Sequence, residues 1–135
     1  MGTRLPAVLA ALAATVGFAG CGQDLSGVDT EQIESVVLQF AEADDEHACA
    51  LLSPHALQNL YGDFEKPVSV ARRNCIRASK KFEGAPIEIE NLNVIDENRA
   101  RVSATDPSGD VAYGVNLRRY GPSWRIESIS QAKND

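Results

Sequence analysis

Cys21 is the residue of this 135-residue chain whose surroundings point most directly to chemistry. It closes the run Phe18-Ala19-Gly20-Cys21, after an apolar stretch from Leu5 to Phe18 that follows Arg4. A charged start, an apolar stretch and small residues before a cut are the three parts of an export signal. In bacterial lipoprotein signals the small residues present the thiol for attachment of a diacylglyceryl group, and cleavage follows on its N-terminal side. The sequence therefore predicts that Cys21 is acylated.

Acylation would make residues 1–20 a signal peptide and residues 21–28 a short lipidated tether. Each methylene of an acyl chain such as palmitate contributes about 0.8 kcal/mol on entering a bilayer, and two or three chains give stable attachment. The predicted location is the cell envelope, on the extracytoplasmic face of the cell membrane. The alternative is an ordinary secretory signal with a nearby cut, which would leave Cys21 as an odd thiol.

Cys49 and Cys75 are the remaining cysteines, and they are the only possible intrachain pair if Cys21 carries lipid. Thiols of exported chains tend to be oxidised, and a disulfide closing this loop would stabilise the fold by roughly 3.5 kcal/mol. Two buried free thiols are one alternative. A redox pair is another, although the Cys-x-x-Cys spacing that lowers a thiol pKa is missing.

His47 and His55 flank a Ser-Pro turn close to the acidic run 44–46, so two histidines and one carboxylate are candidate metal ligands here. Such a site requires side chains that converge on one point, and this spacing across a helix break does not ensure convergence. We expect no metal and no cofactor. A nucleophilic serine is also not expected, because no Gly-x-Ser-x-Gly elbow is present.

The net charge limits the partners of the chain. It is −6, with 13 Lys and Arg against 19 Asp and Glu, and loss of Arg4 with the signal would make it −7. Acidity on this scale argues against nucleic acid and against electrostatic adhesion to anionic lipid. One predicted helix face nevertheless carries a basic strip of Arg73, Arg77, Lys80 and Lys81, with Arg72 nearby. The strip is either a solvated face or a surface that docks an acidic partner or orients the domain near the membrane.

Helical spacing of apolar residues dominates the first half of the region 29–132, which we expect to form a single domain. Asp29 has the character of an N-cap for the first helix. Ser53 and Pro54 are a cap followed by a first-turn proline, and Gly62 is a stop. The expected helices after the first are 47–52, 55–61 and 68–82.

After Gly84 the apolar period changes from helical to alternating. The pattern predicts four strands separated by turns at 96–98, 106–109 and 121–123, with a bulge near Asn91 in the first. Helices followed by a strand meander favour an α+β fold, in which N-terminal helices pack on a curved antiparallel sheet of about four strands.

Two segments carry a resemblance to a known family: residues 36–40 through 48–53, and the run Gly121-Pro122-Ser123-Trp124-Arg125-Ile126. In these the chain resembles the nuclear-transport-factor-two-like superfamily, the cystatin-like cone that includes SnoaL-like proteins and ketosteroid isomerases. More narrowly, it is similar to small actinobacterial lipoproteins that pair this domain with a helix-to-helix disulfide. The resemblance implies a cone-like fold over nearly the whole mature chain.

A cone of this kind normally leaves a pocket between helices and sheet. Six residues could line it or be ordinary core: Phe40, Leu52, Leu60, Tyr61, Tyr113 and Trp124. Enzymes of the superfamily use a carboxylate base in the cone, and the predicted inner faces carry none. We therefore expect no catalytic residues and a non-catalytic binding or accessory module, whose partner is another envelope protein or a small apolar ligand. The alternative is a small-molecule isomerase or dehydratase; the oligomeric state is left open.

Overall fold

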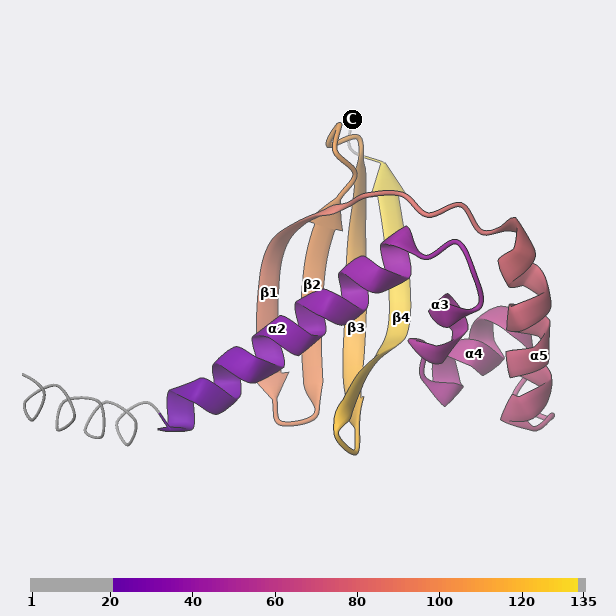
Figure 1. Ribbon diagram of the computed structural model, residues 1–135, viewed down its shortest axis with the longest axis horizontal. Helices are drawn as coiled ribbons and strands as arrows, with labels where there is room; N and C mark the ends of the chain where they lie inside the picture. Colours follow the sequence, from indigo (N-terminus) through magenta and orange to yellow (C-terminus); the bar gives the residue numbers. More distant parts are fainter. Residues whose placement is uncertain (1–20, 134–135) are drawn as a thin grey trace, which may run out of the picture. The chain divides into compact units, whose positions relative to one another are not determined.

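The computed structural model describes the backbone of residues 21–133 and the side chains of residues 29–133. The predicted signal peptide, residues 1–20, lies outside the described residues. The chain divides into two units, Met1–Glu31 and Gln32–Asp135, and the second contains the whole sheet. The elements are α2 (Cys21–Glu42), α3 (His47–Ala50), α4 (Pro54–Tyr61), α5 (Val68–Ala78), the 3-10 turn η1 (Ser79–Lys81), β1 (Glu88–Asp96), β2 (Arg99–Thr105), β3 (Val111–Tyr120) and β4 (Ser123–Lys133), as Figure 1 shows.

The four strands form an antiparallel meander in the order β1-β2-β3-β4. The bulge expected near Asn91 is present, since the register shifts between Ile89 and Asn91. The tight turns use glycine where φ is positive, at Gly109 (79°) and Gly121 (61°). The predicted fold class, helices followed by a four-stranded antiparallel sheet, is confirmed.

Helix α2 begins earlier than the sequence predicted. It is already helical at Cys21, so Asp29 lies inside the helix and the expected N-cap there is wrong. No proline stands between these two positions, so every backbone amide of that stretch can join the helix. The residues predicted to form a tether are helical in the structure, and their role as a tether stays a prediction. From Gln32 onward α2 crosses one face of the sheet (Figure 1).

Helices α3, α4 and α5 form a lobe beside the edge strand β4 (Figure 1). The Ser53 hydroxyl caps α4 by accepting a hydrogen bond of 3.0 Å from the amide of Ala56, as its position before Pro54 predicted. Two backbone bonds join this lobe to β4: the Ser53 amide donates to the Ile126 carbonyl, and the Ile126 amide donates to the Leu51 carbonyl, both at 2.9 Å. Helix α5 packs mainly on α4 rather than on the sheet.

The disulfide expected between Cys49 and Cys75 is confirmed, and it joins α3 to α5 with the two Cα atoms 6.0 Å apart. Both cysteines are buried, as are Ile33 and Val37 of α2 and the inward residues of the sheet. The buried apolar cluster runs from Ile33 to Ile126. A chain that starts at residue 21 therefore keeps every residue of this core.

Candidate functional site

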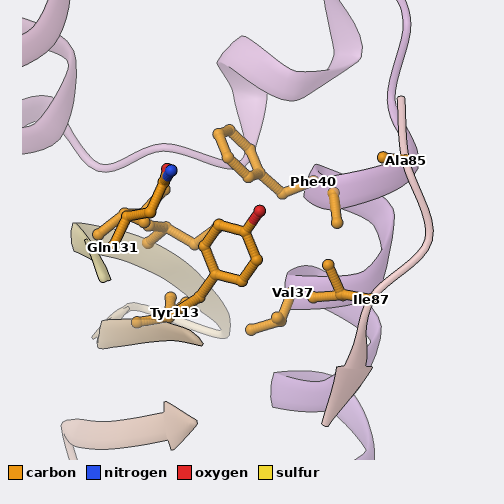
Figure 2. A pocket seen from close by; sticks show the side chains of 10 residues that line it. Val37, Phe40, Ala85, Ile87, Tyr113 and Gln131 are labelled. Carbon is orange, nitrogen blue, oxygen red and sulfur yellow. The ribbon is translucent and has the colours of Figure 1, made fainter. Parts of the chain in front are cut away.

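A cavity of about 300 Å³ lies between α2, the segment that follows Gly84, and strands β3 and β4 (Figure 2). It exists because two apolar surfaces meet incompletely: the helix presents Phe40 and Val37, and the sheet presents a wide, curved face. The residues that line it are Val37, Phe40, Ala41, Ala85, Ile87, Tyr113, Val115, Ile126, Ile129 and Gln131.

The cavity has a closed base and an open mouth. Val37, Val115 and Ile126 belong to the buried core and form the base. Ala85 and Gln131 are exposed, so the mouth lies where the segment after α5 passes the end of β4. A small molecule could enter there without any rearrangement of the core.

Tyr113 and Gln131 supply the two polar side chains of the cavity, and they face each other across β3 and β4 in register. The Tyr113 hydroxyl points into the space between Phe40 and Val37 (Figure 2). The side chains of Tyr113 and Gln131 form no hydrogen bond with any residue of the described part. A phenol and an amide can each donate and accept, so they suit a ligand hydroxyl or carbonyl group.

None of the described residues that line the cavity is Asp, Glu, His, Lys or Arg. Proton abstraction from a substrate requires a positioned base, most often one of these side chains. The cavity combines a mainly apolar wall with two groups that can orient a ligand.

The wall of the mouth is fixed by a close backbone contact. Gly84 passes so near the carbonyl group of Glu42, in the last turn of α2, that a Cβ atom at this position would collide with that carbonyl. The amide of Ala85 donates a hydrogen bond of 2.9 Å to the carbonyl of Ala41. Glycine is therefore required where the chain crosses the end of the helix, and this crossing sets the places of Ala85 and Ile87.

A smaller cavity of about 250 Å³ lies on the other side of Phe40 and Ala41, toward the helical lobe. Tyr61 and Phe82 contribute to its wall, with their ring centroids 6.4 Å apart. Burial raises the pKa of the Tyr61 hydroxyl above its ordinary value, because the charged form loses solvation there. Phe40 thus separates two mainly apolar spaces.

The structure divides the six predicted pocket residues into three groups. Phe40 and Tyr113 line the larger cavity, and Tyr61 lines the smaller one. Leu52 and Trp124 are 1% and 3% exposed and belong to the packed core. Leu60 is 52% exposed on α4 and lines neither of these two cavities, so its place in a pocket stays a prediction; α4 turns Leu57 toward the core.

Ala85, Ile129 and Gln131 were not among the predicted pocket residues, nor were five other apolar residues of the wall: Val37, Ala41, Ile87, Val115 and Ile126. The sequence does contain a signal for Gln131, because alternation along a strand places it on the same face as Ile129, two residues earlier. Ala85 had no such signal, since it follows the helices in a segment without regular structure.

The two histidines occupy separate surroundings. His47 Nε2 lies 2.9 Å from Gln39 Oε1 on α2, and the His55 ring stands 5.2 Å from the ring of Phe64. Among residues with described side chains, no three His, Cys, Asp or Glu residues are grouped as metal ligands would be. Within the same part of the chain, no helix has both the length and the apolar character needed to cross a bilayer.

No family model matches the sequence, and no curated protein matches it. Two solved structures are similar to the chain. One is an NTF-2 like protein of unknown function from Silicibacter pomeroyi DSS-3, with a TM-score of 0.47 and 14% identity, covering 81% of this chain and 98% of that one. The other is a de novo designed protein with a curved beta-sheet, with a TM-score of 0.47 and 11% identity, covering 82% of this chain and 98% of that one. Membership of the superfamily suggested by the sequence stays a prediction.

Proposed function

We propose that this protein is a lipid-anchored, extracytoplasmic binding module that takes a small, mainly apolar ligand with one hydrogen-bonding group. The observation that carries the proposal is the cavity between α2 and the sheet, whose wall is apolar apart from Tyr113 and Gln131. Its volume is at the lower end of the range of about 300–1,000 Å³ typical of ligand sites. A single aromatic ring system or a short aliphatic chain would fit such a space.

The polar pair gives the ligand its expected chemistry. An apolar ligand body gains by leaving water, at about 25 cal/mol per Å² of surface buried. A hydroxyl or carbonyl group on that body would lose its water partners, and the Tyr113 hydroxyl can replace one of them. Alcohols, phenols and ketones are therefore the ligand class that we propose, ahead of pure hydrocarbons and of carboxylates.

The alternative of an isomerase or dehydratase would use the same cavity. It requires a base beside the reacting carbon, and none of the described residues lining the cavity supplies a carboxylate or an imidazole. The binding function is therefore the one that we propose.

The anchoring half of the proposal depends on Cys21 and the residues before it. Mass spectrometry of the protein from its native membrane should show a diacylglyceryl-modified Cys21 as the first residue. Cys21→Ala should move the protein out of the membrane fraction or leave it unprocessed. An unmodified thiol at residue 21 of the mature protein would contradict lipid attachment.

The binding half can be tested with 1-naphthol, a fluorescent phenol, and a chain that starts at residue 21 and carries Cys21→Ser. We expect saturable binding to this chain. Ala85→Phe should abolish it, because a ring at the mouth fills the entrance without touching the core. The matched control is Ala50→Phe, since Ala50 is exposed on α3, away from the cavity.

Tyr113→Phe should weaken 1-naphthol binding by roughly 5- to 10-fold, the worth of one hydrogen bond of about 1 kcal/mol or slightly more. Tyr120→Phe is the matched control, because the Tyr120 hydroxyl bonds Glu127 Oε2 at 2.8 Å rather than pointing into the cavity. Equal binding by the unsubstituted chain and the Ala85→Phe variant would overturn the proposed site.

A further inference from the structure

The sign of the charge reverses along one short stretch of the chain. Residues 66–81 contain six of the thirteen Lys and Arg residues and none of the nineteen Asp and Glu residues. This stretch therefore carries +6 within a chain of net charge −6, and the rest of the chain carries −12. The net charge of the whole molecule conceals this separation.

Helix α5 and the turn η1 present most of these cations on one outward face. Ala71 and Cys75 are the buried positions of α5, and they point toward α4 and α3. On the opposite side the helix exposes its basic residues around Ile76, which is 37% exposed. We call this surface the basic face; it consists of Arg72, Arg73, Ile76, Arg77, Lys80 and Lys81.

The basic face is held rigidly by the opposite side of α5. The disulfide from Cys75 to Cys49 ties the helix to α3. The Asn74 side chain donates a hydrogen bond of 2.8 Å to the carbonyl of Tyr61 at the end of α4. Gly62 approaches Ala71 so closely that a Cβ at Gly62 would lie 2.8 Å from the Ala71 Cβ. The cations are therefore displayed on a fixed surface.

The cations of the basic face have no acidic partner within the described part of the chain. None of the five forms an ion pair or a side-chain hydrogen bond there, whereas Arg99 on the sheet pairs with Asp96 at 2.8 Å. Lys80 and Lys81 also follow the C-terminal end of α5, where the helix dipole favours positive charge. The face therefore has five cations available to an external anion.

We propose that the basic face docks on the anionic phospholipid headgroups of a bilayer. A surface of long cationic side chains around one exposed aliphatic residue suits headgroups in the plane of a membrane. The strongly acidic remainder of the chain would be repelled, which selects this face for the contact.

This interaction does not depend on the lipid anchor, so a chain that lacks the anchor should still bind anionic vesicles. The protein from residue 21, carrying Cys21→Ser, can be mixed with vesicles of equal parts phosphatidylglycerol and phosphatidylcholine, and with vesicles of phosphatidylcholine alone. We expect cosedimentation with the first and not with the second. Added salt should weaken it, because the contact is electrostatic.

A pair of charge-matched variants locates the contact. Arg73→Gln combined with Arg77→Gln should weaken binding to the anionic vesicles by roughly 30-fold, since each cation at such a surface contributes about fivefold. The control is Arg118→Gln with Arg125→Gln, two residues that face each other across β3 and β4, away from α5. It removes the same charge and should change binding by less than about fivefold.

Two outcomes would overturn the proposal. Absence of binding to the anionic vesicles would leave an acidic protein as the partner of this face. Equal losses in the two double variants would mean that total charge, rather than the basic face, governs the contact. Both outcomes are independent of 1-naphthol binding, so failure here leaves the cavity proposal standing.

Discussion

The helical lobe beside β4 and the region between α2 and the sheet differ in how completely their surfaces fit. In the lobe, Leu57 and Cys75 are fully buried and a disulfide joins two of the three helices. Under α2, Phe40 and Tyr113 are only partly buried, and a cavity remains beside them. The covalent link thus lies in one region and the proposed ligand site in the other.

The largest effect should come from removing the covalent link of the lobe. Cys49→Ser with Cys75→Ser should lower the free energy of unfolding by about 3.5 kcal/mol, because the unfolded chain loses its closed loop. Denaturant titration of both chains would measure the difference. Reduction of the disulfide in the unsubstituted protein should lower the free energy of unfolding by the same amount. Retention of full stability by the double variant would contradict the assigned role of the disulfide.

An identical substitution in each region should sharpen the contrast. Ala71→Leu adds volume to a close helix contact and should cost about 1–3 kcal/mol, as overpacking does. Ala41→Leu adds the same volume beside the two cavities and should raise stability by roughly 0.5–2 kcal/mol, as cavity filling does. It should also reduce 1-naphthol binding. If thermal unfolding shows similar destabilisation by both changes, the difference in packing between the two regions is contradicted.

The smallest expected effect is on stability in acid, and it depends on Asp106 in the turn between β2 and β3. Asp106 Oδ1 accepts a hydrogen bond of 3.1 Å from the Val111 amide, and Oδ2 accepts one of 2.8 Å from the Ser108 hydroxyl. These bonds, the Val111 amide first, lower the pKa of the Asp106 carboxyl below its ordinary value of 3.8. Ionised Asp106 therefore stabilises the folded chain fully above its ordinary pKa of 3.8. This stabilisation is lost as the pH falls through the lowered pKa of the folded state.

Asp106→Asn should lower the melting temperature at neutral pH, and the difference from the unsubstituted chain should shrink in strong acid. Asp110→Asn is the matched control, because the Asp110 carboxylate accepts no hydrogen bond in the described part of the chain. Melting curves over the acidic range would measure both. A difference for Asp106→Asn that stays constant with pH would contradict the assigned charge effect.

Local chemistry made most of the fold predictable from the sequence. Ser53 and Pro54 start α4 as caps and first-turn prolines do, and the change to alternating spacing after Gly84 marks the start of the sheet. The start of α2 was not predictable in this way, because Asp29 looks like a cap but the preceding residues also permit a helix. Capping motifs are reliable where a breaker stands beside them, as Pro54 does.

The cavity could be predicted only in part, because it depends on how α2 and the sheet fail to fill the space between them. Tyr113 and Phe40 were expected there from their faces, whereas Trp124 and Leu52 lie on equivalent apolar faces and are packed. Helical and strand periods show which side of an element faces inward. They do not show the distance between two layers, and so they do not show whether a space remains between them.

The central claim, that the space under α2 is a ligand site, is tested most directly by amide NMR spectra of the chain from residue 21, recorded with and without 1-naphthol. We expect the amide signals of residues 37–41, Ala85, Ile87, 113–115 and 129–131 to shift saturably, while those of α5 stay unchanged. Shifts confined to α5, or the absence of any saturable shift, would contradict it.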